Sequence, residues 1–464
     1  MLTPRQGLLA LIIFLACAIR LYRLPEMAPF DFDQEYAANF AYRVLNVYPI
    51  QLIGQGLSVQ GLFMGPLYFY FLVPFYALFN LHPIGGTIGS IVLGIITIVT
   101  YFFVVKQVFG NVAGLIAAFL RASLFSYINT DWSVTPAFSS DLIALITWFC
   151  FYKYWQGQHK YLILLGLIFG MYTSMHPILF PFYIVFLILF LIKRQLPKKQ
   201  TIFLSLLTFL IPLSPLLIFE YLHNFLEVKL LFSFFSSTGG EISRIPQMII
   251  YAQNIFTDLA SNLRLPIWFS IVYFTILFFL IYKKIGFWKN QFHLFFLLSS
   301  TVVFLLYYSF FPKIVPEYYF AALTTTNLIY FSANLSLLYQ KRSRPILLIS
   351  LVLITYLNLN YLRHHKWDHQ NTASLYNKEQ IVKKIKNDNT ENNQVFVSYI
   401  KLPGRDFGFS YLLNYYQIKL NDNAQDPIYT IVVPISLSPD SIDFRSGDAG
   451  VIFPSNSKNS DRKE

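Results

Sequence analysis

The stretch LFMGPLYFYFLVPFYALFN, residues 62–80, decides how this chain is threaded through a membrane. The run is long enough to cross a bilayer as a helix, but Gly65, Pro66 and Pro74 interrupt it. If the run crosses, every later loop of the chain changes sides. The charges in those loops distinguish the two topologies.

The composition of the whole chain is that of a membrane protein. Of its 464 residues, 55% are hydrophobic and 12% are charged, whereas a soluble domain has about 25% charged residues. We expect an all-α polytopic membrane domain with about eleven transmembrane helices, not counting the 62–80 run. We predict these helices at 7–22, 85–105, 110–128, 137–153, 161–176, 178–192, 201–219, 266–282, 292–309, 318–338 and 346–361.

The loops between these runs differ sharply in charge. If 62–80 does not cross, the loops on the side of the N-terminus contain basic residues and no Asp or Glu: Arg5, Lys106, Lys153, Lys160, Lys193, Arg194, Lys198, Lys199, Lys283, Lys284, Lys289, Lys341, Arg342 and Arg344. The opposite loops hold nearly every acidic residue of the membrane region: Asp31, Asp33, Glu35, Asp131, Asp141, Glu220, Glu227, Glu241, Asp258 and Glu317. Cytoplasmic loops are enriched in Lys and Arg. The pattern therefore predicts a cytoplasmic N-terminus, with 62–80 on, or dipping into, the outer membrane surface.

Two outer loops and a C-terminal segment are long enough to hold structure of their own. The first loop, 23–84, contains a predicted amphipathic helix at about 33–46, with Ala37, Phe40, Ala41 and Val44 on one face. The second, about 220–265, includes the flexible-looking segment SSTGGEIS. No convincing internal repeat is present in the sequence, which argues against a transporter built from inverted repeats.

The composition changes at about residue 363, where the chain becomes polar. This predicts two domains, a membrane domain at 1–362 and a small extracytoplasmic α/β domain at 363–464. In the second domain SLYNKEQIVKKIKN and GFSYLLNYY predict helices, and QVFVSYI and IYTIVVPI predict strands. The tail PSNSKNSDRKE has the composition of a disordered segment.

Several function classes are disfavoured. The net charge of +12 comes from basic loops between apolar runs, so it does not predict nucleic-acid binding. Cys17 and Cys150 lie inside apolar runs and predict no disulfide or metal site. The sequence has no Walker A loop, HExxH, GxSxG or Cys/His zinc pattern. Because the polar candidates lie outside, where soluble nucleotides are scarce, a membrane-bound activated donor fits better.

The stretch PFDFDQEYAA, residues 29–38, places Asp31, Asp33 and Glu35 within five positions. One interpretation is structural, because Asp31 can cap a helix with Gln34 in a capping box. The other is an active site, in which a carboxylate at the outer membrane face takes a proton from an acceptor hydroxyl as general base. The sequence alone leaves both interpretations open.

Other polar residues of the outer loops are candidates for the same site, and each also has an ordinary structural interpretation. Asp131 lies in YINTDWSVTPAFSSD, where Asp141 is a candidate N-cap of the next span. Arg121 lies within a predicted span, so it either extends to the interface or contacts an anionic substrate. The remaining candidates are His176, Arg244, Lys313 and Glu317.

Together these segments resemble the GT-C glycosyltransferases, in particular the polyprenyl-phosphate-sugar-dependent branch related to protein mannosyltransferases and aminoarabinose transferases (glycosyltransferase family 39-like). The resemblance covers roughly residues 5–340. It rests on the order and sidedness of DFDQEYAA, GLFMGPLYFYFL, KQVFGNVAGLIAAFL, TDWSVTPAF, SMHPILFPFY and PKIVPEYYF. It implies inverting transfer of a sugar from a polyprenyl phosphate to an acceptor hydroxyl outside the membrane, in the cell envelope.

The resemblance also implies roles for particular residues. The catalytic aspartate maps best to Asp33, with Asp31 as the competing choice, and Asp131 matches the polar position of the second loop. Arg121, Arg244 and Lys313 are the candidate cations for the carrier phosphate, and Glu35, His176 and Glu317 are further candidate substrate-binding residues. No cofactor is expected. A divalent metal held by Asp33 and Asp131 is the less favoured alternative.

The expected partners are a polyprenyl-phosphate-linked donor, a lipid, glycan or protein acceptor, and the plasma membrane. Two other functions stay open. One is a transporter or flippase of lipid-linked glycans, which would place ionisable residues at mid-membrane. The other is a scaffold without catalytic activity.

Overall fold

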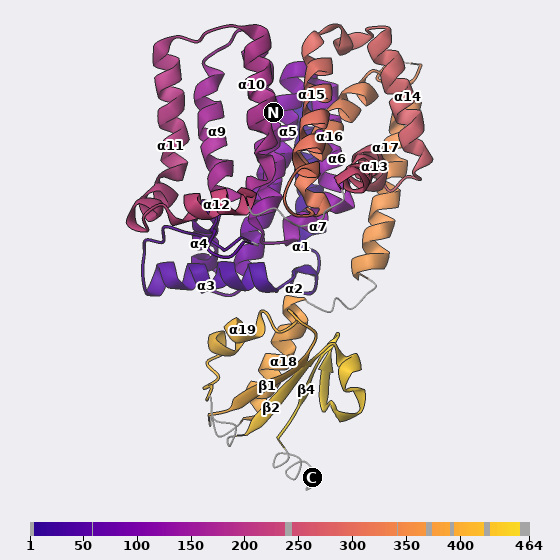
Figure 1. Ribbon diagram of the computed structural model, residues 1–464. Coiled ribbons are helices and arrows are strands. Elements are labelled where there is room, and N and C mark those ends of the chain that lie inside the picture. The colour runs from indigo at the N-terminus through magenta and orange to yellow at the C-terminus, as the bar shows by residue number, and fades with distance from the viewer. Residues whose placement is uncertain are drawn as a thin grey trace.

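The computed structural model describes residues 4–57, 59–236, 244–340, 342–367, 374–389, 394–421 and 427–454. A large helical part and a small domain with a β-sheet lie end to end, and the sheet domain covers the end formed by α2 and α3 (Figure 1). The segment SSTGGEIS lies almost wholly outside the described residues, as does the tail after Pro454. The predicted flexibility of both therefore stays a prediction.

The helical part contains a helix at each of the eleven predicted spans and at the run 62–80. Its α-helices are α1 (Pro4–Leu21), α2 (Leu24–Met27), α3 (Phe32–Asn46), α4 (Leu67–Leu78), α5 (Ile84–Phe109), α6 (Asn111–Ser123), α7 (Phe125–Trp132), α8 (Ser140–Trp155), α9 (Tyr161–Met175), α10 (Pro181–Lys193), α11 (Lys199–Leu222), α12 (Leu226–Ser236), α13 (Arg244–Leu263), α14 (Trp268–Tyr282), α15 (Gln291–Ser309), α16 (Ala321–Ser336) and α17 (Arg344–Leu362). Short helical turns connect some of them: η1 (Pro136–Ser139), η2 (Pro177–Leu179), η3 (Gly286–Lys289), η4 (Glu317–Phe320) and η5 (Arg363–Trp367).

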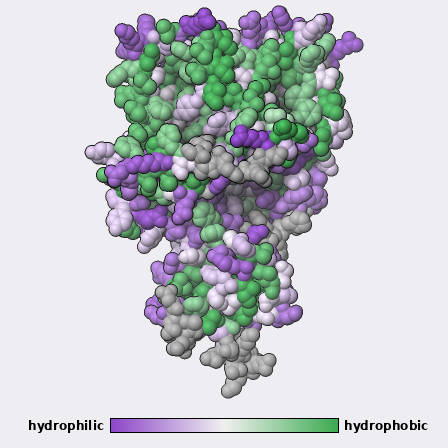
Figure 2. All heavy atoms as spheres, in the orientation of Figure 1, coloured by the Kyte–Doolittle hydropathy of each residue, from purple (hydrophilic) through white to green (hydrophobic). Residues whose placement is uncertain are grey.

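The lengths of these helices are those of a polytopic membrane protein. Within the described residues, five helices are long and apolar enough to cross a bilayer: α1, α5, α11, α15 and α17 with η5. The number becomes seven if two bent pairs each count as one span, namely α6 with α7, bent by 60°, and α13 with α14, bent by 103°. Apolar side chains form a broad zone around the middle of the helical part, with polar residues above and below it (Figure 2).

The run 62–80 forms α4, a helix of only 12 residues. A helix of this length extends about 18 Å, whereas the hydrocarbon core is about 30 Å thick. Two predicted spans, α6 and α10, are helices of only 13 residues each, so helix length does not decide whether 62–80 crosses, and its place outside the membrane stays a prediction. Figure 1 shows α3 lying across the end of the bundle, beside α4. The predicted apolar face of α3 is confirmed, because Ala37, Phe40 and Ala41 are buried.

The bundle is close-packed where small residues face neighbouring helices. A Cβ atom added to Gly166 or Gly170 of α9 would collide with the backbone carbonyls of Ser205 and Phe209 in α11. These two helices therefore depend on glycine for their close approach, as membrane helices often do. Gly110, at φ 95°, makes the turn between α5 and α6.

The C-terminal domain confirms the four predicted elements. Its sheet has the order β1–β2–β4–β3, with β1 (Phe396–Lys401) parallel to β2 (Ile428–Val433) and antiparallel pairing of β2 with β4 (Ala449–Ile452) and of β4 with β3 (Phe444–Ser446). The helices are α18 (Leu375–Asp388) and α19 (Phe409–Tyr415), followed by the short turns η6 (Ile435–Leu437) and η7 (Pro439–Ser441). The predicted face of α18 is buried: Leu375, Ile381, Val382 and Ile385.

Candidate active site

Asp31 is engaged in structural contacts at the start of α3. It is the N-cap residue, and its backbone N–H donates to Gln34 Oε1 at 2.9 Å, as part of the predicted capping box. Its side chain also accepts a hydrogen bond from Lys378 Nζ of α18 at 2.7 Å. Asp31 therefore begins the helix and pairs with the C-terminal domain.

Glu35, one helical turn later, contacts the same domain. Its two carboxylate oxygens accept hydrogen bonds from the backbone N–H groups of Gly408 and Tyr411, each at 2.9 Å. N–H groups at the start of a helix have no acceptor within that helix, so Glu35, a residue of α3, caps α19. The structure gives Glu35 a structural contact, and its predicted role in substrate binding stays a prediction.

Asp33 lies between these two residues but contacts the membrane part. Its Oδ1 accepts a hydrogen bond from Gln55 Nε2 at 2.7 Å, and its Oδ2 accepts one from Thr135 Oγ1 at 2.9 Å. Thr135 belongs to the loop that follows α7, so the first and second outer loops meet at this carboxylate. Each oxygen of Asp33 keeps a further acceptor position, and the residue is half-buried.

A small polar cavity of about 10 Å³, roughly the space of one water molecule, lies behind Thr135. Its polar lining includes Tyr68, Ser90, Thr130, Asp131 and Ser139. Burial raises the pKa of Tyr68 above its ordinary value of 10, and the negative charge of Asp33 contributes to the rise. Asp33 is therefore close enough for its charge to act on the wall of this cavity.

Asp131 is buried and paired with two arginines. Its Oδ2 accepts hydrogen bonds from Arg20 Nε at 2.7 Å and Arg121 Nη1 at 3.0 Å, and its Oδ1 accepts one from Arg121 Nη2 at 2.8 Å. The backbone of Gly94 passes so close that a Cβ atom there would collide with this carboxylate. This geometry is that of a structural ion network. It does not support the predicted catalytic role of Asp131, which stays a prediction.

The network continues to Asp141, which accepts a hydrogen bond from Arg121 Nε at 2.6 Å. The other oxygen of Asp141 accepts from the Tyr101 hydroxyl at 2.6 Å and the Thr325 hydroxyl at 2.8 Å. Arg20, Arg121, Asp131 and Asp141 thus balance to zero charge inside the bundle, as buried ions require. Arg121 donates from all three of its nitrogens to these carboxylates, which leaves it poorly placed to bind the carrier phosphate.

His176 shapes the surroundings of the site. Its Nδ1 accepts a hydrogen bond from the backbone N–H of Ile178 at 3.2 Å, and its ring lies against Tyr319 and Tyr318. The Tyr318 ring also contacts Phe138, three residues after Thr135. These aromatic contacts connect η2 and η4 to the segment around Thr135, whose hydroxyl donates to Asp33.

The remaining predicted residues are exposed. Arg244 is the first residue of α13, and its guanidinium lies over the Phe310 ring, 5.3 Å from the ring centre. Lys313 and Glu317 lie in the segment between α15 and α16.

The residues do not fit the metal site considered from the sequence. Both oxygens of Asp131 already accept hydrogen bonds from arginines, so Asp33 and Asp131 do not converge on a shared ion. Among the described residues, no group of three or more His, Cys, Asp and Glu side chains is placed to hold a metal.

Four residues around the site were not predicted from the sequence. Gln55 and Thr135 orient Asp33, Lys378 contacts Asp31, and Arg20 contacts Asp131. Arg20 carried a signal, because it is a charged residue inside a predicted span, and such residues rarely lack a function or a partner. Gln55 and Thr135 carried none, since uncharged polar residues are ordinary in outer loops.

A bundle of apolar helices with an oriented carboxylate at one end, beneath a small α/β domain, is the architecture of the GT-C membrane glycosyltransferases. The comparisons agree with that class. Residues 64–219 match the family model described as dolichyl-phosphate-mannose-protein mannosyltransferase. No curated protein matches the sequence.

Two solved structures share the fold. ArnT from Cupriavidus metallidurans bound to undecaprenyl phosphate is 10% identical, with a TM-score of 0.63 over 96% of this chain and 98% of that chain. The Archaeoglobus fulgidus oligosaccharyltransferase in complex with Zn and sulfate is 12% identical, with a TM-score of 0.50 over 92% of this chain and 68% of that chain. The family model covers about a third of this chain, and the two solved structures show that the chain shares the fold of the GT-C membrane glycosyltransferases.

Proposed function

We propose that this protein transfers a sugar from a polyprenyl-phosphate-linked donor to an acceptor hydroxyl, on the extracytoplasmic side of the plasma membrane and with inversion at the anomeric carbon. The observation that supports the proposal most strongly is that the three carboxylates of residues 29–38 make different contacts. Asp31 and Glu35 hold the C-terminal domain. Asp33 is held in place by Gln55 and Thr135 and keeps acceptor capacity on both oxygens.

In the proposed reaction Asp33 is the general base. The acceptor hydroxyl donates a hydrogen bond to the carboxylate, and its oxygen attacks the anomeric carbon from the face opposite the phosphate. The bond between that carbon and the phosphate oxygen breaks, its electron pair leaves with the polyprenyl phosphate, and the hydroxyl proton passes to Asp33. A single displacement of this kind inverts the configuration.

The carrier phosphate needs little help as a leaving group, because it departs as a stable anion. It does need nearby cations. Arg244 and Lys313 are the better candidates, since Arg121 is committed to Asp131 and Asp141. The polyprenyl carrier is suggested by ArnT, whose structure is described with undecaprenyl phosphate bound. The assignment of the outer side rests on the charges of the loops.

The test is transfer of labelled sugar from polyprenyl-phosphate sugars by the purified protein. Asp33→Asn removes the base and keeps the shape of the side chain, with one acceptor oxygen retained and the other replaced by an amide donor, and we expect it to abolish transfer. Asp31→Asn is the matched control two residues away, and we expect it to keep most of the activity. Near-normal turnover of Asp33→Asn, or equal loss in both variants, would contradict the assignment.

A further inference from the structure

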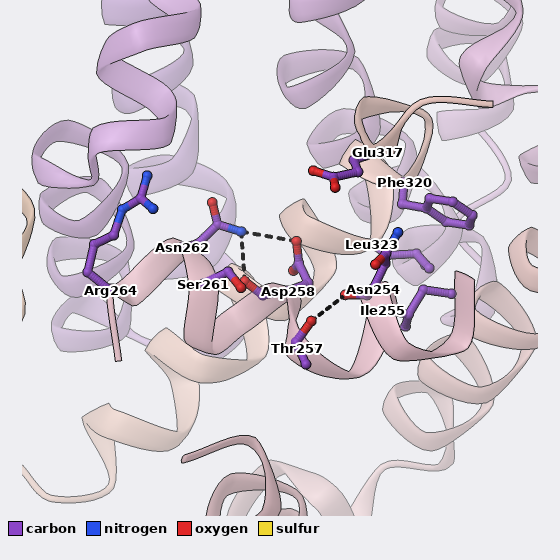
Figure 3. Close-up of a pocket in the computed structure, with 10 residues that line it drawn as sticks. All are labelled: Asn254, Ile255, Thr257, Asp258, Ser261, Asn262, Arg264, Glu317, Phe320 and Leu323. Carbon is purple, nitrogen blue, oxygen red and sulfur yellow. Dashed lines mark hydrogen bonds between the residues drawn. The ribbon is translucent and has the colours of Figure 1, made fainter. Parts of the chain in front are cut away.

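A second polar cavity lies away from Asp33, between α13 and the segment that leads into α16 (Figure 3). Its volume is about 280 Å³, near the lower end of small-molecule sites. Ten residues line it: Asn254, Ile255, Thr257, Asp258, Ser261, Asn262, Arg264, Glu317, Phe320 and Leu323. Seven of them come from α13 or the residue directly after it.

The polar lining is one face of α13. Asn254, Thr257, Asp258, Ser261 and Asn262 follow the spacing i, i+3, i+4, i+7 and i+8, which places them along one side of a helix. A helix at a membrane surface gains nothing by turning such a stripe toward lipid. The stripe faces the cavity instead (Figure 3).

Asp258 is fixed in position by three donors. Its Oδ1 accepts hydrogen bonds from Asn262 Nδ2 at 3.0 Å and Thr324 Oγ1 at 2.7 Å, and its Oδ2 accepts one from Asn327 Nδ2 at 2.9 Å. Thr324 and Asn327 belong to α16, so this carboxylate joins α13 to the bundle. Its Oδ2 keeps an acceptor position for a ligand hydroxyl.

An apolar groove continues from this cavity. It has a volume of about 260 Å³ and shares Ile255 and Leu323 with the polar cavity. The rest of its lining comes from α14, α15 and α16: Phe274, Leu277, Phe278, Ile281, Leu297, Leu298, Thr301, Val302, Thr326 and Asn327. A polar cavity joined to an apolar groove matches a molecule with a polar head and a hydrocarbon tail.

The charges indicate which kind of head group fits. Asp258 and Glu317 are acidic, whereas Arg264 is the one basic residue in the cavity lining. The Arg264 guanidinium lies over the Tyr361 ring, 3.7 Å from the ring centre. Two carboxylates against one cation repel a phosphate, while carboxylate, amide and hydroxyl groups together suit the hydroxyls of a sugar or polyol.

Contacts between aromatic side chains connect the edge of the cavity to the surroundings of Asp33. Glu317, at that edge, directly precedes Tyr318, and the Tyr318 ring contacts Phe138 and His176. Phe138 lies in η1, which begins directly after Thr135, the residue that donates to Asp33. A continuous series of side-chain contacts therefore joins the edge of the cavity to the proposed base.

We infer that this cavity and groove bind the acceptor, and that the acceptor is a lipid with a hydroxylated head group that carries no phosphate. The head group lies on the polar face of α13, and the hydrocarbon chain lies between α14 and α15. The inference rests on the proposed function, because it names the acceptor class for the transfer at Asp33.

The experiment measures binding of a dodecyl glucoside to the full chain, purified in a zwitterionic detergent without sugar groups, by isothermal titration. Asn254→Leu removes an amide from the cavity, and Ser261→Leu fills it. We expect each variant to weaken glucoside binding about tenfold or more, the effect of losing one or two hydrogen bonds. Gln253→Leu, an exposed neighbour of Asn254 outside the cavity lining, is the matched control and should bind normally.

Undecaprenyl phosphate is the second probe, and its binding should be the same in all four proteins. If Asn254→Leu and Gln253→Leu bind glucoside equally, or if Asn254→Leu loses undecaprenyl phosphate instead, the inference is overturned. Asp33→Asn separates this inference from the proposed function. It should bind glucoside normally without transferring sugar, so an active Asp33→Asn refutes the proposed function even where the glucoside data hold.

Discussion

The ammonium group of Lys378 lies 2.7 Å from Oδ1 of Asp31, and this contact joins positions 347 residues apart. The same ammonium donates to the backbone carbonyls of Phe30 and Phe407, each at 2.7 Å. The Lys378 side chain is buried, whereas 40% of the Asp31 side chain is exposed, so the contact with Phe30 is buried and the other two are partly buried. The C-terminal domain is thereby held to the segment that carries Asp33.

Lys378→Met should loosen the C-terminal domain. The substitution keeps the apolar stem but leaves two carbonyls and a carboxylate without their donor, which should cost about 2–3 kcal/mol of unfolding free energy. We expect a lower unfolding temperature and faster proteolysis of the domain. Lys383→Met removes an exposed ammonium from Glu379 and from the Tyr416 ring, and Glu379 keeps its contact with His82, so unfolding should change by about 1 kcal/mol or less. Equal effects of the two substitutions would show that Lys378 does not hold the domain.

Thr135→Val should reduce turnover without removing the base. The substitution keeps the size of the side chain but removes the hydroxyl that donates to Asp33 Oδ2. A base that is free to rotate loses its alignment, so we expect kcat to fall by about 10- to 100-fold with little change in the KM for the donor. Thr135→Ser restores the hydroxyl and should restore most of kcat. If it does not, Thr135 acts through packing and not through Asp33.

Arg121→Met and Arg20→Met should differ in severity. Arg121 donates to both Asp131 and Asp141, so its loss leaves two buried carboxylates poorly paired and should cost about 3–5 kcal/mol. After Arg20→Met, Asp131 keeps both bonds from Arg121, so the cost should be smaller. Size-exclusion profiles and thermal unfolding measure the order. A well-folded Arg121→Met protein that fails to bind donor would restore the phosphate-binding role predicted from the sequence.

The stability should fall as pH rises from about 4.5 to 7, in part because of Glu227. Burial, together with the charge of Glu220, raises the pKa of Glu227 from 4.5 to about 7. Between these values the unfolded chain has released this proton while the folded protein keeps it, so higher pH favours unfolding. Glu227→Gln should reduce the difference in unfolding temperature between pH 5 and pH 7. An unchanged difference would mean that Glu227 is not the responsible group.

Chelation should leave transfer unchanged. Both oxygens of Asp131 are occupied by arginine donors, so the one metal site considered from the sequence lacks its second ligand. Activity measured after EDTA treatment, with and without added Mg²⁺ or Mn²⁺, checks this. Loss on chelation and recovery on adding a divalent ion would mean that a metal contributes to the site.

The sequence predicted most of the fold because the relevant signals are local. Apolar run length and the 3.6-residue period each depend on neighbouring residues, and they correctly located the helices. The same holds for the capping box of Asp31, which spans four residues.

The site was less predictable because its contacts join distant segments. Asp33 meets Thr135 across 102 positions, and Arg20 meets Asp131 across 111. Charge and loop position do not distinguish Asp131 from Asp33, since each is an acidic residue in an outer loop, and only the resemblance favours Asp33. In the structure the partner distinguishes them, because a carboxylate between two arginines is neutralised, whereas one held by an amide and a hydroxyl keeps its charge available.

The spacing of the three carboxylates at the start of α3 has a consequence for the design of chimeras and for the exchange of domains between related proteins. Asp31, the N-cap, and Glu35 both contact the C-terminal domain, while Asp33, about 200° from Glu35 around the helix axis, contacts the bundle. The start of α3 thus both contacts the C-terminal domain and carries the proposed general base. A chimera that receives a C-terminal domain from another transferase must therefore also receive matching residues at positions 31 and 35, and the two regions are expected to be exchanged together.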